Sequence, residues 1–183
     1  MRDGRRVRIV NHCVHKRKRQ SCPTRYGPGD KGGRRIHECV IGNLAYRLRI
    51  HLEGSVCQIF SAGMKLQLAD DTVLCRDVLV TCDRDDLQAE LAMRSPTLVI
   101  EVLSPSTQAY DRSQTFARTY RSLASLKEYI LIGPETLRIE SFRREPDDRW
   151  VLYDFSQNAV MDCASVGCAV PLAQVFEGVK PAE

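Results

Sequence analysis

The sequence contains no apolar run close to the roughly 18 residues that a membrane-spanning helix requires, so a membrane-inserted protein is excluded. Its first residues, MRDGRRVRIVNHC, carry arginines but lack the apolar stretch of a secretory signal peptide. Only eight of the 183 residues are cysteine, too few for a disulfide scaffold. We therefore expect reduced thiols in a cytosol, used mostly as small core residues.

The composition is that of an ordinary soluble domain, with 43% hydrophobic and 27% charged residues. A chain of 183 residues predicts about one domain. The net charge of +4 is unevenly divided, because residues 1–35 hold twelve Lys or Arg against two Asp, about +10, which leaves about −6 for residues 36–183. This asymmetry is a pattern expected of a chain that contacts a phosphate-rich partner such as a nucleic acid. The alternative is a solvated, disordered run of charges.

The clearest boundary in the chain is the segment of residues 21–33, SCPTRYGPGDKGG, in which two prolines and four glycines interrupt any helix or strand. It separates a basic extension, residues 1–35, from a single domain, residues 36–183. Apolar residues at every fourth position between Ile36 and Leu52 predict an amphipathic helix. Strands are predicted next at residues 56–60, 64–68 and 73–82.

The second half of the domain opens with TLVIEVL, residues 97–103, a nearly unbroken apolar run that predicts a strand covered on both faces. A second helix is predicted over residues 107–123, and residues 161–179 are expected to be mostly loop with a short helical turn near residues 172–176. Further strands are predicted at residues 128–132, 137–143 and 150–155. The pattern predicts an α/β fold: a central mixed sheet flanked by helices, with additional carboxy-terminal strands.

Two carboxylates, Asp77 and Glu101, interrupt the predicted core strands. A carboxylate in such a place is costly unless it is paired or binds a cation. If the two strands are neighbours, both side chains can hold one divalent ion, and oxygen ligands favour Mg²⁺ or Mn²⁺. Such an ion could bind a scissile phosphate and activate a water. The alternative is that each carboxylate forms a salt bridge, for which Arg76, Arg112 and Lys65 are available.

Five segments of the sequence, in order, resemble the "Putative restriction endonuclease" family of the PD-(D/E)XK nuclease superfamily: FSAGMKLQL, CRDVLVTCDRDD, SPTLVIEVLSPSTQAYDR, SLKEYILI and VPLAQVFEGV. The resemblance covers about residues 36–179. It implies a restriction-endonuclease-like core in which Asp77 matches the Asp of the PD motif and Glu101 matches the acidic residue of the next core strand. It also implies a Mg²⁺-dependent (or Mn²⁺-dependent) endonuclease that hydrolyses DNA phosphodiester bonds, for which the cysteine content predicts a cytoplasmic location. A homodimer would fit, since each active site of such nucleases cuts one strand.

The chain departs from the family at three positions that bear on catalysis. The Pro before the Asp is Arg76, the superfamily lysine two residues after Glu101 is Leu103, and the helix position to which the family often moves that lysine is Thr115. Lys65 matches the family's strand lysine and is the candidate for the basic role, with a solvated or structural lysine as the alternative. A second function is therefore predicted beside the first: a catalytically defective nuclease-fold protein that binds nucleic acid or regulates without cleaving.

Other candidate sites have weaker support in the sequence. The His and Cys residues of the basic extension lack the paired spacing of a closed zinc site. Cys163 and Cys168 are predicted to be core residues. Lys127, at the start of a predicted strand, is a weaker substitute for the basic role than Lys65.

Overall fold

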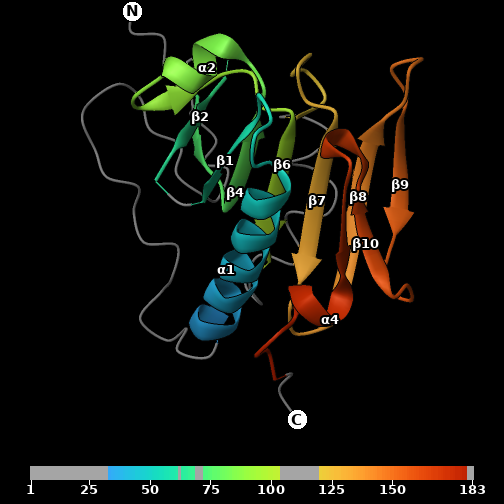
Figure 1. The fold of residues 1–183 in the computed structure, drawn as a ribbon. Helices are drawn as coiled ribbons and strands as arrows, with labels where there is room; N and C mark the ends of the chain where they lie inside the picture. Colours follow the sequence, from blue (N-terminus) through green and yellow to red (C-terminus); the bar gives the residue numbers. More distant parts are fainter. Residues whose placement is uncertain (1–32, 62, 69–71, 104–119, 181–183) are drawn as a thin grey trace, which may run out of the picture.

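A six-stranded mixed sheet is the central element of the computed structural model, which describes residues 33–61, 63–68, 72–103 and 120–180 (Figure 1). Only β6 and β7 are parallel within this sheet, whereas its other neighbouring strands are antiparallel. Every residue of β4, β6 and β7 is buried, as expected for strands covered on both faces. The strands, in spatial order, are β1 (Gln58–Ser61), β4 (Val78–Thr81), β6 (Leu98–Val102), β7 (Glu128–Gly133), β8 (Arg138–Arg144) and β9 (Trp150–Asp154). The predicted α/β fold with a central mixed sheet is confirmed.

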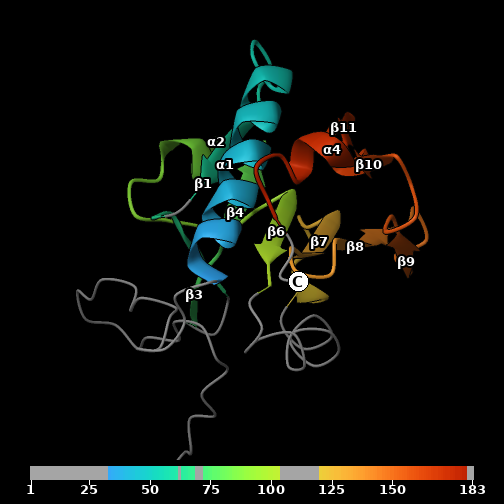
Figure 2. The same ribbon diagram turned by 90° about the horizontal axis from the view of Figure 1, so that it is seen from below.

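One face of the sheet is covered by helix α1 (Gly33–His51) and by a carboxy-terminal hairpin with a short helix after it (Figure 2). The hairpin and its flanking turns are β10 (Val160–Cys163), η2 (Ala164–Val166), β11 (Cys168–Pro171) and α4 (Leu172–Val175). Val40, Leu44 and Leu48 lie four residues apart on α1, so they share one face of the helix and are fully buried against the sheet. We call this apolar layer the first core cluster.

The opposite face of the sheet packs against a second, three-stranded sheet. Its strands are β3 (Val73–Cys75), β2 (Lys65–Gln67) and β5 (Ala92–Met93), with the short helix α2 (Arg84–Gln88) between β4 and β5. Leu66 and Leu74 of the small sheet meet Leu79 and Val99 of the large one, together with Tyr120. We call this layer the second core cluster.

The single strand predicted over residues 73–82 is in fact two strands in different sheets. β3 ends at Cys75 and β4 begins at Val78, and Arg76 and Asp77 lie between them, with a bend at Asp77. The chain changes sheets here because Leu74 packs in the second core cluster, while Val78 begins a strand that also contributes to the first. This change of sheet places Asp77 at the entrance of β4.

The prediction for the tail is also corrected by the structure. Residues 161–179, expected to be mostly loop, contain most of the β10–β11 hairpin, because Met161 and Cys163 face the first core cluster while Asp162 between them does not. The helical turn predicted near residues 172–176 is confirmed as α4. The predicted helix of residues 107–123 lies outside the described residues except for its last four, and so does nearly all of the basic extension.

The cysteines do not all behave as predicted. Cys57 and Cys82 form a disulfide, which follows from a register in which Gln58 of β1 faces Thr81 of β4. Cys75 is disulfide-bonded as well. The expectation of reduced thiols is therefore wrong for these three. The expectation holds for Cys163 and Cys168, which are free and buried in the first core cluster. Burial there raises the pKa of the Cys163 thiol well above its usual value.

Candidate functional site

The two carboxylates singled out in the sequence come from neighbouring strands. β4 and β6 pair antiparallel with Val78 opposite Ile100, and one further step in that register places Asp77 opposite Glu101. Val99 and Leu103 face the second core cluster, so alternation along β6 directs Glu101 to the same face. Both carboxylates are buried, with 5% of Asp77 and 2% of Glu101 exposed. The fold thus places the two carboxylates on neighbouring strands, which is the condition that the predicted shared ion requires.

Glu101 is held by two donors on one carboxylate oxygen. Nη1 of Arg76 lies 2.6 Å from Oε1 of Glu101, and both side chains are 2% exposed. The Tyr120 hydroxyl donates to the same oxygen at 2.7 Å. The Arg76 guanidinium also lies over the Tyr120 ring, with Cζ 5.1 Å from its centroid. We call these three side chains the Arg76 triad. The salt bridge offered as the alternative for Glu101 is present.

Asp77 has a different set of partners. The backbone N–H of Val102 donates to Oδ2 of Asp77 at 2.9 Å, so this side chain pairs with β6 just before β4 begins at Val78. Nε2 of His37, on the first turns of α1, lies 3.4 Å from Oδ1 of the same carboxylate, and His37 is buried as well. A carboxylate with these neighbours is fixed in orientation between the helix and the sheet.

The candidate basic residue, Lys65, lies on β2 in the small sheet, where its register partner is Cys75. Leu66 faces the second core cluster, so Lys65 occupies the other face of its strand and is half-buried. Leu103 is a core residue of the second cluster. Thr115 lies outside the described residues. Lys127 is exposed, and its backbone pairs with Thr97, at the end of β6 away from Glu101.

Two site residues were not identified from the sequence. Tyr120 lies in the predicted helix of residues 107–123, and its hydroxyl gave no signal in the pattern. His37 directly follows Ile36, the first residue of the predicted apolar stripe, and a histidine near a helix start has many structural roles. Arg76 did give a signal, because a charged residue beside the first carboxylate stood where the resembling family has Pro.

The charges around Asp77 and Glu101 determine whether these two carboxylates can bind a metal ion. Two carboxylates are suitable ligands for Mg²⁺ or Mn²⁺, but the Arg76 guanidinium, which stays protonated in proteins, already faces Glu101. Within the described part of the chain, no group of three or more His, Cys, Asp or Glu side chains could hold a metal ion. The pair as folded therefore does not fit a divalent cation.

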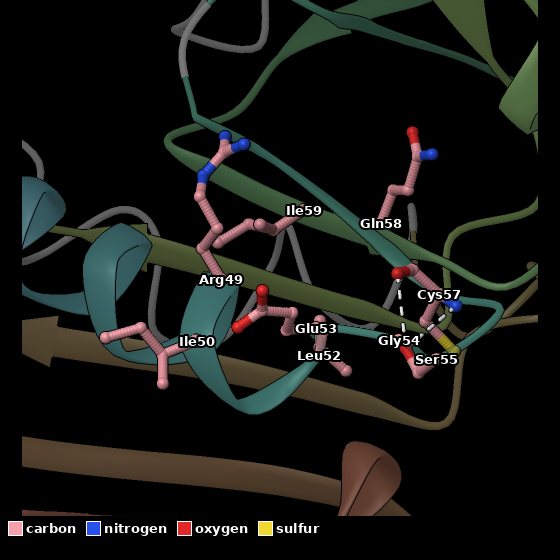
Figure 3. Close-up of a pocket in the computed structure, with 9 residues that line it drawn as sticks. All are labelled: Arg49, Ile50, Leu52, Glu53, Gly54, Ser55, Cys57, Gln58 and Ile59. Carbon is pink, nitrogen blue, oxygen red and sulfur yellow. Dashed lines mark hydrogen bonds between the residues drawn. The ribbon is translucent and has the colours of Figure 1, made fainter.

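A separate hollow, whose lining residues are shown in Figure 3, lies away from Asp77 and Glu101. Its volume is about 590 Å³, and it is lined by the end of α1 and the start of β1, including Arg49, Glu53 and Gln58. Since Gln58 pairs with Thr81, this hollow is at the end of β4 that carries the Cys57–Cys82 disulfide. None of the predicted site residues lines it.

Comparison with known proteins gives the chain a family. The sequence model of the family described as "Uma2: Putative restriction endonuclease" matches residues 30–172, which include Asp77, Glu101 and the Arg76 triad. The chain belongs to this family. The predicted resemblance is thereby confirmed, and a nuclease family is the coarse functional class of the chain.

Two curated relatives come from Synechocystis sp. "Uncharacterized protein slr1290" is 30% identical over 149 residues, covering 81% of this chain and 78% of the relative. "Uncharacterized protein sll1609" is 28% identical over 130 residues, covering 69% of this chain and 73% of the relative. Each alignment therefore covers more than two thirds of both chains.

A solved structure confirms the nuclease-like fold. The crystal structure described as "a putative nuclease belonging to DUF820" from Anabaena variabilis matches with a TM-score of 0.58 and 17% identity, over 79% of this chain and 82% of that one. At this identity the likeness establishes the fold alone. In addition, none of the helices in the described ranges is long and apolar enough to span a membrane.

Proposed function

We propose that this chain is a member of the nuclease family that binds DNA without cleaving it. The observation that carries this proposal is the ion pair between Arg76 and Glu101, at 2.6 Å and almost entirely shielded from solvent. In this family fold, Glu101 is one of the two carboxylates expected to hold a metal. A carboxylate that already has a buried guanidinium as counter-ion has little remaining attraction for a second cation.

The two positions at which the family carries its lysine also support a protein that does not cleave DNA. Leu103 fills the position two residues after Glu101 with a core side chain, and Thr115 stands at the helix position. Neither residue can supply the positive charge that stabilises a transition state, and losing such a group costs about 10² to 10⁴ in rate. The buried counter-ion of Glu101 and the absence of a lysine at positions 103 and 115 support the same function.

DNA is the proposed partner for two reasons. A nuclease family implies a nucleic-acid substrate, and the basic extension of residues 1–35, with a charge of about +10, provides an attraction for phosphates that does not depend on base sequence. A protein of this kind would regulate access to the DNA it covers. A cytoplasmic location is proposed with it because the proposed partner is DNA. The disulfide between Cys57 and Cys82 removes the separate argument from reduced thiols.

The second candidate is the one the family suggests directly, a Mg²⁺-dependent or Mn²⁺-dependent DNA endonuclease that acts as a homodimer. The observation in its favour is the antiparallel register that brings Asp77 and Glu101 opposite one another. In that case the two carboxylates would be the metal ligands and Lys65 the basic residue. Arg76 would then have to leave Glu101 before an ion could bind.

One experiment separates the two candidates. The full chain is incubated with supercoiled plasmid and either Mg²⁺ or Mn²⁺, while its affinity for a labelled duplex is measured by fluorescence anisotropy. We expect saturable binding and no nicked product with either ion. Absence of binding would contradict the proposal.

The control for this experiment is the Asp77→Asn variant, purified in parallel. Any nicking that remains in the variant comes from a contaminating nuclease. Nicking by the native chain that needs the metal and disappears in Asp77→Asn would establish the second candidate instead, because Asp77 is a ligand only in that mechanism.

A further inference from the structure

In the Arg76 triad, the Arg76 guanidinium is the cation, and it is contacted by the Glu101 carboxylate and by the Tyr120 ring. The guanidinium meets Oε1 of Glu101 at 2.6 Å, and the Tyr120 hydroxyl donates to the same oxygen at 2.7 Å. The Tyr120 ring also lies against the guanidinium, 5.1 Å from Cζ to the ring centroid, and stacks on Tyr129 with 4.5 Å between ring centroids. The positive charge is thus fixed in place by packing from the second core cluster as well as by its counter-ion.

We propose that Arg76 is a resident cation that fills the cation position of the Asp77–Glu101 pair. The native chain then takes up no divalent cation at this pair, and neutralising Arg76 alone converts the pair into a Mn²⁺ site. The inference rests on the proposed function, because it explains how the carboxylates are retained while the metal is not. Its test uses the metal alone, so it can fail while DNA binding stands.

The charges around Asp77 and Glu101 explain why the single guanidinium of Arg76 is sufficient to exclude a divalent cation. Asp77 and Glu101 contribute two negative charges in a buried setting. Arg76 offsets one of them permanently, and Nε2 of His37 lies 3.4 Å from Oδ1 of Asp77. A divalent ion added to this group would face a buried positive charge at short range, where the low dielectric makes repulsion strong.

Removing the Arg76 guanidinium makes binding of a divalent cation favourable instead of unfavourable. Glu101 would remain buried next to Asp77, and two adjacent buried carboxylates without a counter-ion destabilise the fold. A hard divalent ion relieves that repulsion, since Mg²⁺ and Mn²⁺ sites commonly use one or two carboxylates and complete their shell with water. The ion and the arginine are therefore alternatives for the same place.

The test measures Mn²⁺ binding to the full chain without DNA, by titration calorimetry and by the shift in melting temperature. The native chain and Arg76→Lys, which keeps the charge, should show no binding and no shift. Arg76→Gln should bind Mn²⁺ and melt at a higher temperature when Mn²⁺ is added, because a ligand that binds only the folded state stabilises it. Adding Asp77→Asn to Arg76→Gln should abolish both effects.

Three outcomes would overturn the inference. Mn²⁺ binding by the native chain that is lost in Asp77→Asn shows that Arg76 does not fill the site. A folded Arg76→Gln chain that binds no Mn²⁺ shows that the carboxylates do not form a latent ligand pair. An Arg76→Gln chain that is unfolded alone and stays unfolded with Mn²⁺, judged by circular dichroism, leads to the same conclusion.

Discussion

At the scale of single residues, Arg76 and Glu101 stabilise the fold only as a pair. Both are about 2% exposed, so removing either one leaves an uncompensated charge in the core. We expect Glu101→Gln to lower the free energy of unfolding by about 3 to 5 kcal/mol. The double variant Arg76→Met, Glu101→Gln should recover much of that loss, because no buried charge is left without its partner. Urea denaturation followed by circular dichroism measures both.

The matched control is the ion pair of Arg138 and Asp154, in which Nη2 of Arg138 lies 3.6 Å from Oδ2 of Asp154. Both of these side chains are nearly half exposed. Arg138→Gln should change the free energy of unfolding by less than about 1 kcal/mol, since water screens such pairs. If Glu101→Gln had an effect as small as that of Arg138→Gln, the ion pair in the core would not be a structural element.

The candidate site was partly predictable from the sequence at this scale. Asp77 and Glu101 were identifiable because a carboxylate within an apolar strand needs a physical explanation. Arg76 could be named as a potential partner from its position alone, but the choice between Arg76 and the other available cations depends on where the chain bends after Cys75. Tyr120 could not be assigned a polar role, because the hydroxyl that reaches Glu101 comes from a segment nineteen residues away in the sequence.

At the scale of secondary-structure elements, the disulfide between Cys57 and Cys82 joins β1, an edge strand of the central sheet, to β4. It closes a loop with a sequence separation of 25 residues. The chain-entropy model assigns such a cross-link about 3 to 4 kcal/mol of stabilisation. We expect Cys57→Ala to lower the free energy of unfolding by that amount under oxidising conditions, measured by urea denaturation.

Reduction provides the control for this prediction. With dithiothreitol present, the difference between the native chain and Cys57→Ala should largely disappear, because neither then carries this cross-link. Cys163→Ala provides a comparison, since Cys163 is free and buried and its loss removes packing in both conditions. A Cys57→Ala effect that is the same with and without reductant would contradict the disulfide.

The elements that the sequence predicted correctly are those with a strong local pattern. The stripe of α1 and the apolar run of β6 report burial directly, so their positions could be read from the residues. The break between β3 and β4 was missed because both strands are apolar, and the pattern does not record which sheet each joins. The Cys57–Cys82 disulfide depends on the register of β1 against β4, which is a tertiary property.

At the scale of the whole molecule, the division of charge predicts how DNA binding depends on salt. Because residues 1–35 carry about +10 and residues 36–183 about −6, phosphate contacts should come mainly from the extension. The logarithm of the association constant falls with the logarithm of salt concentration by about 0.9 for each phosphate neutralised. Replacing Lys16, Arg17, Lys18 and Arg19 with Gln should therefore reduce the slope by about 3 to 4, as measured by fluorescence anisotropy in a KCl series.

The comparison variant removes the same number of positive charges from the body of the protein, where Arg49, Arg84, Arg121 and Lys127 are all exposed. Changing these four to Gln gives a chain of identical net charge, so any general effect of net charge is the same in both variants. If the extension makes the contacts, the second variant keeps the slope of the native chain. An equal loss of slope in both variants would mean that DNA responds to the total charge, and a loss only in the second would move the interface to the folded domain.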